Sequence, residues 1–182
     1  MTSQAFQTFT HVIQDAADLL AHFDTINSQP SPDNAEVLKR AGLVMALAAL
    51  ETYVEDRICE AAEHVVGRDG SGGRIRAFYL ASLENDLKYF HTPTPDRVGK
   101  IFEKYLQINV LEGWVWNHYD PARAKGHLSA IAKKRGDIAH RSLRPVPGQP
   151  VSHAVTREDL RKHIRFISDL VAATDRFIEA KL

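Results

Sequence analysis

The sequence contains very little cysteine and no long apolar run. Cys59 is the single cysteine among 182 residues, which excludes a disulfide framework and a cysteine-based zinc site. The longest apolar stretch, residues 42–50, is far too short to span a bilayer, and residues 1–6 lack the basic start and apolar core of a signal peptide. We therefore expect a soluble protein of the reducing cytoplasm that does not associate with a membrane.

Motifs for metal, phosphate and nucleophilic chemistry are also missing. A di-iron helical bundle needs two Glu-x-x-His pairs, whereas Glu60 and His64 stand alone at a different spacing. The glycine-rich residues 67–74 lack the Lys-Ser or Lys-Thr step of a phosphate-binding loop, so we interpret them as a connector. No Gly-x-Ser-x-Gly elbow is present. The sequence thus predicts neither a metal nor another cofactor.

Proline occurs only in expected loops and first helical turns. The long intervals between prolines show apolar residues three and four apart, which predicts an all-α protein. With 44% hydrophobic residues, residues 1–182 can form a single domain around one core. We expect an up-and-down bundle of about six helices, over residues 3–26, 32–66, 74–90, 95–108, 121–141 and 157–181.

Capping signals support these helix starts. Three starts place a capping side chain before a proline at the first helical position, where the missing N–H costs nothing. They are Ser31-Pro32, Thr94-Pro95 and Asp120-Pro121, and Thr156 is a weaker fourth signal. Residues 41–50 are apolar on every side, which predicts that the second helix is central and that its small residues allow close neighbours.

One segment concentrates positive charge in a chain whose net charge is 0. Residues 123–144 contain seven Lys or Arg and two His against one acid. Residues 1–120 carry ten Lys or Arg against seventeen acids, and residues 121–182 carry thirteen against six. Because the whole chain is neutral, this asymmetry favours a localised site for an anion such as phosphate over general binding of polyanions. The alternative is that the basic residues only solvate the outer face of a helix.

Three aromatic residues precede this basic segment. Trp114, Trp116 and Tyr119 could stack on nucleic-acid bases, at about 1–3 kcal/mol each, or could close the end of the core. We favour the core for Trp114 and leave both interpretations open for the other two.

Arg135, Asp137 and His140 bring cleavage chemistry to the basic segment. A histidine can transfer protons near neutral pH, and an arginine can stabilise charge on phosphoryl oxygens, which suits attack by an RNA 2′-hydroxyl without a metal. Asp137 lies three residues before His140 and can face it across one helical turn. Lys133, Lys134 and Arg141 are available for flanking phosphates.

A single helix provides only half of such a site. Residues 135 and 140 are separated by about 140° around a helix and about 7.5 Å along it, so their side chains flank a face. Two copies packed around a two-fold axis would bring two arginines and two histidines to one groove. Gly136 fits this arrangement, because a glycine inside a helix costs about 1 kcal/mol and usually has a reason such as close backbone approach.

At these residues the chain resembles the HEPN superfamily of small all-α domains, whose ribonuclease members carry an Arg followed by a His after a short gap. Here the gap is four residues, between Arg135 and His140. The Arg-x-x-Ile-Ala-His form and the helix around residues 47–54 look most like the RiboL-PSP-associated branch.

The resemblance implies a homodimeric, metal-independent endoribonuclease that acts as the toxin of a toxin–antitoxin or antiphage pair. Its partners would be RNA, a second copy, and an antitoxin such as a nucleotidyltransferase-like protein. Many active members have a polar residue directly after the Arg, where this chain has Gly136, so either Asp137 does that work or the protein is a weakened or purely binding member. Glu51 is a further candidate for orienting the arginine, or else a surface acid. The alternative function is a non-catalytic HEPN-like module that binds a nucleotide or a protein through the same residues.

Overall fold

The computed structural model describes residues 2–28, 32, 35–68, 73–141 and 155–182, and nearly all of them are helical. The bounds differ from the predicted ones by no more than three residues. Across the described residues the elements are α1 (Gln4–Ile26), α2 (Ala35–Arg68), α3 (Gly73–Leu87), α4 (Pro95–Leu106), the short 3₁₀ helix η1 (Val110–Gly113), α5 (Pro121–Arg141) and α6 (Arg157–Glu179). The all-α prediction is therefore confirmed.

Three of the four predicted caps are formed. The side chains of Thr94, Asp120 and Thr156 accept hydrogen bonds from the backbone N–H groups of Arg97, Arg123 and Asp159. Each cap satisfies one of the N–H groups that the first turn of a helix leaves without a partner. The predicted cap at Ser31 lies outside the described residues, as do residues 69–72 of the predicted connector.

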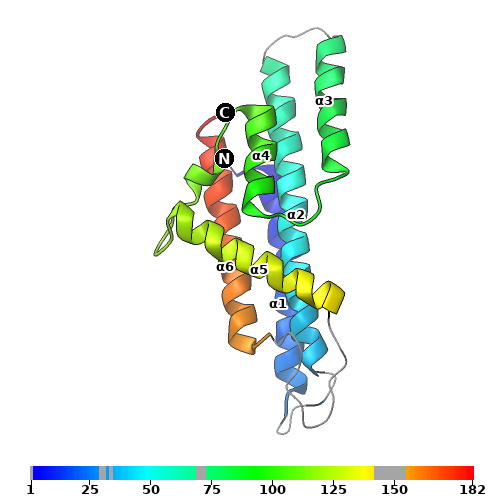
Figure 1. The fold of residues 1–182 in the computed structure, drawn as a ribbon, viewed down its shortest axis with the longest axis vertical. Helices are drawn as coiled ribbons and strands as arrows, with labels where there is room; N and C mark the ends of the chain where they lie inside the picture. The colour runs from blue at the N-terminus through cyan, green and yellow to red at the C-terminus, as the bar shows by residue number, and fades with distance from the viewer. Residues whose placement is uncertain (1, 29–31, 33–34, 69–72, 142–154) are drawn as a thin grey trace.

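Helix α2 is the centre of the bundle, as the apolar run predicted. It packs along α1 and α6, and Figure 1 shows these three long helices lying side by side. Gly42 is a point of close approach, because a Cβ there would lie 2.8 Å from the Leu160 side chain of α6. One hydrophobic core draws residues from every helix of the described chain.

A buried polar cluster joins the two ends of the chain inside this core. Arg57 Nε donates to Asp175 Oδ1 at 3.0 Å, and Arg57 Nη2 donates to Glu179 Oε1 at 2.8 Å. Ser3, which caps α1, and Tyr53 also donate to the Asp175 carboxylate. Burial, with the nearby Asp175 adding to it, raises the pKa of Tyr53 well above its usual value. The cluster thereby ties α1, α2 and α6 together.

The remaining helices cover α2 and α6. Helix α3 packs on the distal half of α2, whereas α5 crosses the front of the bundle in Figure 1. None of the helices in the described residues is long and apolar enough to cross a membrane. The side of α5 that faces away from the bundle is exposed.

Candidate active site on helix α5

Helix α5 is amphipathic, and this decides which of its residues reach the surface. Ala124, Leu128 and Ile131 are fully buried, so the side of the helix that carries them faces the core. The outward side is small and polar. Its exposed residues are Ala122, Arg123, Lys125, Gly126, Ser129, Ala130, Lys133 and His140.

Arg135 and His140 lie at different depths on α5. Arg135 follows Leu128 by seven residues, nearly two full turns, which places it on the same side of α5 as the buried Leu128, and it is half-buried. His140, about 140° further round, is exposed. In the part of the chain that the structure describes, no hydrogen bond or ion pair engages either side chain. Neither side chain therefore takes part in a polar contact that the described part of the fold uses.

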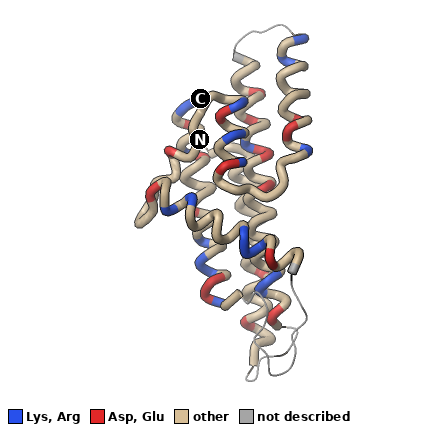
Figure 2. The backbone as a smooth tube through the Cα atoms, in the orientation of Figure 1, with Lys and Arg blue, Asp and Glu red and all other residues tan. Residues whose placement is uncertain are grey.

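The other predicted site residues differ in their surroundings. Lys133 is exposed, whereas Lys134 is half-buried with its Nζ 3.9 Å from Asp159 Oδ2 at the start of α6. Asp137 is half-buried, and the side chain of Arg141 lies outside the described residues. Figure 2 shows the Lys and Arg of α5 gathered toward its two ends. The predicted cationic segment is thus on the surface, with one of its charges partly balanced.

Glu51 contacts the connection between α3 and α4. Its Oε2 accepts a hydrogen bond from the backbone N–H of Thr92 at 3.1 Å. Thr92 has φ of 66°, in the left-handed region that is costly for a β-branched residue, so this bond supports the connection between α3 and α4. Within the described residues, no hydrogen bond or ion pair joins Glu51 to Arg135.

Two of the three aromatic residues close the corner between η1, α5 and α6, and the third enters the core. Trp114 is buried, and its indole N–H donates to Thr174 Oγ1 at 3.0 Å. Trp116 stacks on Tyr119 with 4.7 Å between ring centroids, and both rings contact Phe166. The core role expected for Trp114 is what the structure shows, and the rings of Trp116 and Tyr119 pack against protein.

A pair of histidines beside these rings escaped the sequence argument. The Tyr119 hydroxyl lies 2.5 Å from His127 Nδ1, and His127 Nε2 lies 3.4 Å from His163 Nδ1. If Tyr119 donates to Nδ1, the other nitrogen of His127 carries the proton shared with His163, and both rings are neutral. Burial, together with the nearby His127, lowers the pKa of His163 to about 4. Burial also lowers the pKa of His127.

A weak sequence signal for this pair existed. His163 lies three residues from both Leu160 and Phe166, and His127 lies three after Ala124, so each histidine borders a buried stripe. Their contact could not be foreseen, because they are 36 positions apart in the chain. Among the described residues there is no group of three or more His, Cys, Asp or Glu that could hold a metal ion.

Comparison with known families agrees with this architecture. The family model described as RiboL-PSP-HEPN matches residues 10–180, which include the whole of α5. The chain belongs to the RiboL-PSP-HEPN family. No curated protein and no solved structure matches it.

Membership identifies the fold as a HEPN helical bundle and confirms the resemblance inferred from the Arg-x4-His motif. It also places the protein among HEPN-type ribonucleases and related modules. Of the two motif residues of this HEPN protein, Arg135 is half-buried and His140 is exposed, and both lie in the C-terminal part of α5.

Proposed function

We propose that this HEPN protein is a cytoplasmic, metal-independent endoribonuclease of toxin–antitoxin or antiphage type. The supporting observation is that Arg135, half-buried, and His140, exposed, lie in the C-terminal part of α5 without an internal partner among the described residues. An arginine that the fold used for its own stability would be paired, as Arg57 is.

The reaction requires only proton transfers and charge stabilisation. One His140 accepts the proton of an RNA 2′-hydroxyl, and the 2′-oxygen attacks the adjacent phosphorus. A second imidazole protonates the departing 5′-oxygen, while Arg135 stabilises the negative charge on the phosphoryl oxygens. The products are a 2′,3′-cyclic phosphate and a 5′-hydroxyl.

We infer that the second set of groups comes from a second copy packed on the outward side of α5. A Cβ at Gly126 or at Gly136 would meet nothing within 4 Å, so both glycines leave open space on the surface of the described chain. That space lets another helix approach closely. Such an approach would explain why a glycine, which destabilises a helix relative to alanine, stands at position 136. A two-fold axis here makes the contact isologous and completes the half-site.

The remaining site residues have supporting roles in this proposal. Lys133, Lys134 and Arg141 bind flanking phosphates, and Asp137 orients His140 or favours its protonated form. Asp137 thereby takes the place of the polar residue that Gly136 replaces.

The reaction can be tested with purified protein and an end-labelled RNA oligonucleotide. Cleavage should persist in EDTA, leave a 2′,3′-cyclic phosphate, and stop when the scissile sugar is 2′-deoxy. His140→Ala should abolish cleavage while RNA binding remains, and the matched control His22→Ala, an exposed histidine on α1, should cleave normally. Arg135→Lys should restore little of the activity lost in Arg135→Ala, because lysine lacks the planar fork. Cleavage that disappears with chelator and returns with magnesium would exclude this mechanism.

Subunit mixing tests whether the site is shared between copies. A dimer of one wild-type and one His140→Ala copy holds a single His140, whereas the proposed reaction uses one from each copy. Excess His140→Ala should therefore lower the cleavage rate per wild-type copy, and excess His22→Ala should not. A rate that stays proportional to the amount of wild type after confirmed subunit exchange would place the site within a single copy.

The alternative function, a non-catalytic HEPN module that binds a nucleotide or a protein, predicts different outcomes. Expression of the wild type would then leave cellular RNA intact, and His140→Ala would weaken binding instead of cleavage. Under our proposal, expression arrests growth with RNA breakdown, His140→Ala does not, and an antitoxin such as a nucleotidyltransferase-like protein relieves the arrest.

A further inference from the structure

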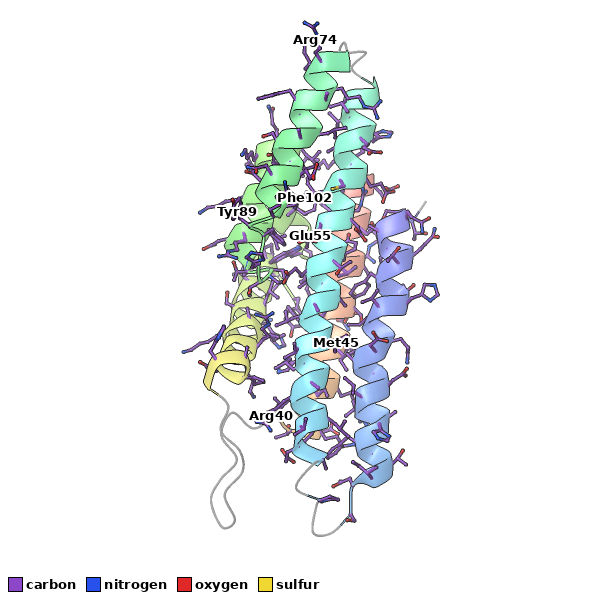
Figure 3. All side chains as sticks on the ribbon, turned by 90° about the vertical axis from the view of Figure 1, so that its right-hand side faces the viewer. Arg40, Met45, Glu55, Arg74, Tyr89 and Phe102 are labelled. Atoms are coloured by element: carbon purple, nitrogen blue, oxygen red, sulfur yellow. The ribbon has the colours of Figure 1, made fainter. Side chains whose placement is uncertain are left out.

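Helix α3 exposes an unusual amount of apolar surface. Leu83 is its only buried residue, whereas Ile75 and Phe78 are 65% and 77% exposed. Tyr89, just past the end of the helix, is 73% exposed. Figure 3 shows Arg74 at the tip of α3 and Tyr89 pointing away from the bundle near its base.

The outward side of α3 combines one large ring with small neighbours. At 100° per residue, five residues lie within about 60° of Phe78 around the helix. They are Arg74, Ile75, Ala81, Ser82 and Asn85, of which Ser82 is half-buried and turned toward α4, with its hydroxyl 3.1 Å from the Tyr105 hydroxyl. Leu83 lies on the opposite side, where it packs into the core. A surface helix normally carries several charged residues on its exposed side, whereas Arg74 is the only charged residue among these five.

We propose that this side of α3 is a self-association surface, and that its occupant is the α3 of a second copy in antiparallel orientation. Around a two-fold axis between residues 79 and 80, Phe78 of one copy lies opposite Ala81 of the second copy, and the reverse. Each ring then fills the space beside a small residue, as an isologous contact requires.

The charges at the two ends of α3 fit the same register. Around the helix, Arg74 lies about 40° and Glu84 about 120° from Phe78 in the same direction, and in the antiparallel pair each lies at the level of the other residue of the second copy. Both are exposed, and Glu84 has within the described chain only a long contact of 4.0 Å to Lys88. A parallel pairing would instead place Arg74 opposite Arg74 and leave Glu84 without an opposite charge at its level. Charge complementarity therefore selects the antiparallel orientation.

The contact is expected to be weak by itself. A helix of 15 residues is about 22 Å long, and a single pair of such helices buries less than the roughly 800 Å² per partner of a standard interface. The surface is separate from the outward side of α5, so its loss should leave a dimer formed through α5 intact. If both contacts form, dimers join into larger assemblies at high concentration.

Sedimentation over a range of concentrations tests the proposal. Phe78→Asp should weaken the concentration-dependent association by at least about thirtyfold, because the ring is buried twice in a two-fold contact. Val115→Asp, at another exposed apolar residue, should associate like the wild type. Circular dichroism should show both variants folded. The proposal is overturned if Phe78→Asp and the wild type associate equally, or if the wild type does not associate beyond any α5 dimer.

A charge swap tests the antiparallel register. Arg74→Glu and Glu84→Arg should each weaken association about tenfold, because each creates two like-charge contacts. Equimolar mixing of the two variants should restore it, since every contact in the mixed pair is again between opposite charges. In a Cys59→Ala background, Ala81→Cys should cross-link between copies on oxidation, whereas the exposed Ala21→Cys of α1 should not. Failure of the mixture to recover, or equal cross-linking of both cysteine variants, would refute the register. None of these readouts depends on RNA cleavage.

Discussion

Two arginines of this protein, Arg57 and Arg135, show how differently one side chain can be used. Arg57 is 1% exposed, and its guanidinium binds the carboxylates of Asp175 and Glu179. Arg135 is half-buried on α5 and has no hydrogen bond or ion pair to any described residue. The first serves the fold, because burying a guanidinium is tolerable only when its charge is matched. The second leaves its hydrogen-bonding capacity for a ligand.

The same contrast separates the two regions around these arginines. At the end of the bundle that contains Arg57, Ser3 and Tyr53 add hydrogen bonds to Asp175 until the buried carboxylate is fully engaged. On the outward side of α5, Lys133 and His140 are exposed and unpaired within the described residues. Internal satisfaction of polar groups thus marks a structural cluster, and the unpaired groups on α5 are those that our proposal assigns to RNA binding.

The largest expected difference between the two regions is the effect on stability of replacing each arginine by an apolar residue. Arg57→Leu should lower the free energy of unfolding by about 3–5 kcal/mol, because Asp175 would remain buried without a cation. Arg135→Leu should change it by no more than about 0.5 kcal/mol. Urea unfolding of both variants at one protein concentration measures the difference. Equal losses for the two variants would contradict the assignment of separate roles.

The histidine pair beside α5 should make stability depend on pH. The pKa of His163 is lowered from 6.5 to about 4 in the folded protein, so the unfolded chain binds more protons between these values. Stability is therefore full above pH 6.5 and falls as the pH decreases from 6.5 toward 4. After allowance for solvent screening, we expect a loss on the order of 1 to 2 kcal/mol.

His163→Gln isolates this effect, because glutamine can still accept a hydrogen bond from His127 but does not titrate. Thermal unfolding between pH 8 and 4.5 should show a flatter profile for this variant than for the wild type. His22→Gln, at an exposed position, should keep the wild-type profile. A His163→Gln profile as steep as that of the wild type would assign the pH dependence to other groups.

A smaller effect is expected at the start of α6, close to the site. Thr156 Oγ1 accepts a hydrogen bond from the Asp159 N–H at 3.0 Å, so Thr156→Ala should cost about 1 kcal/mol of stability. Ser129→Ala, on the outward side of α5, should be neutral within about 0.5 kcal/mol. Chemical unfolding of the two variants compares a structural polar group with one that the fold does not use.

The smallest expected difference is between the neighbouring Lys133 and Lys134, in the salt dependence of RNA binding. Lys133 is exposed and Lys134 has Asp159 nearby, so the charge of Lys134 is already partly balanced. If RNA lies along α5, Lys133→Ala should reduce the salt dependence of binding by about one counterion, and Lys134→Ala should reduce it less. Fluorescence anisotropy with an uncleavable 2′-deoxy analogue at several salt concentrations measures both slopes. A larger effect at Lys134 would indicate that the RNA binds nearer to α6 than we propose.

Much of the fold could be predicted because its signals are local. Thr94, Asp120 and Thr156 cap the first turns of their own helices, and the spacing of Leu128 and Ile131 fixes the buried side of α5 within a few residues of chain. The Arg-x4-His spacing on one helix was likewise visible in the sequence. The hydrogen bond between Glu51 and the Thr92 backbone could not be predicted, because the two residues are 41 positions apart.

Only the tertiary structure decided which charged groups the fold uses for itself. The sequence determined the helices, their apolar sides and the positions of Arg135 and His140, because each follows from residues within one or two turns. It did not distinguish Arg57 from Arg135, nor did it bring His127 to His163, since those outcomes depend on contacts between helices more than 30 positions apart. Burial and pairing are properties of the packed chain, and they alone show which cations remain free to bind an anion.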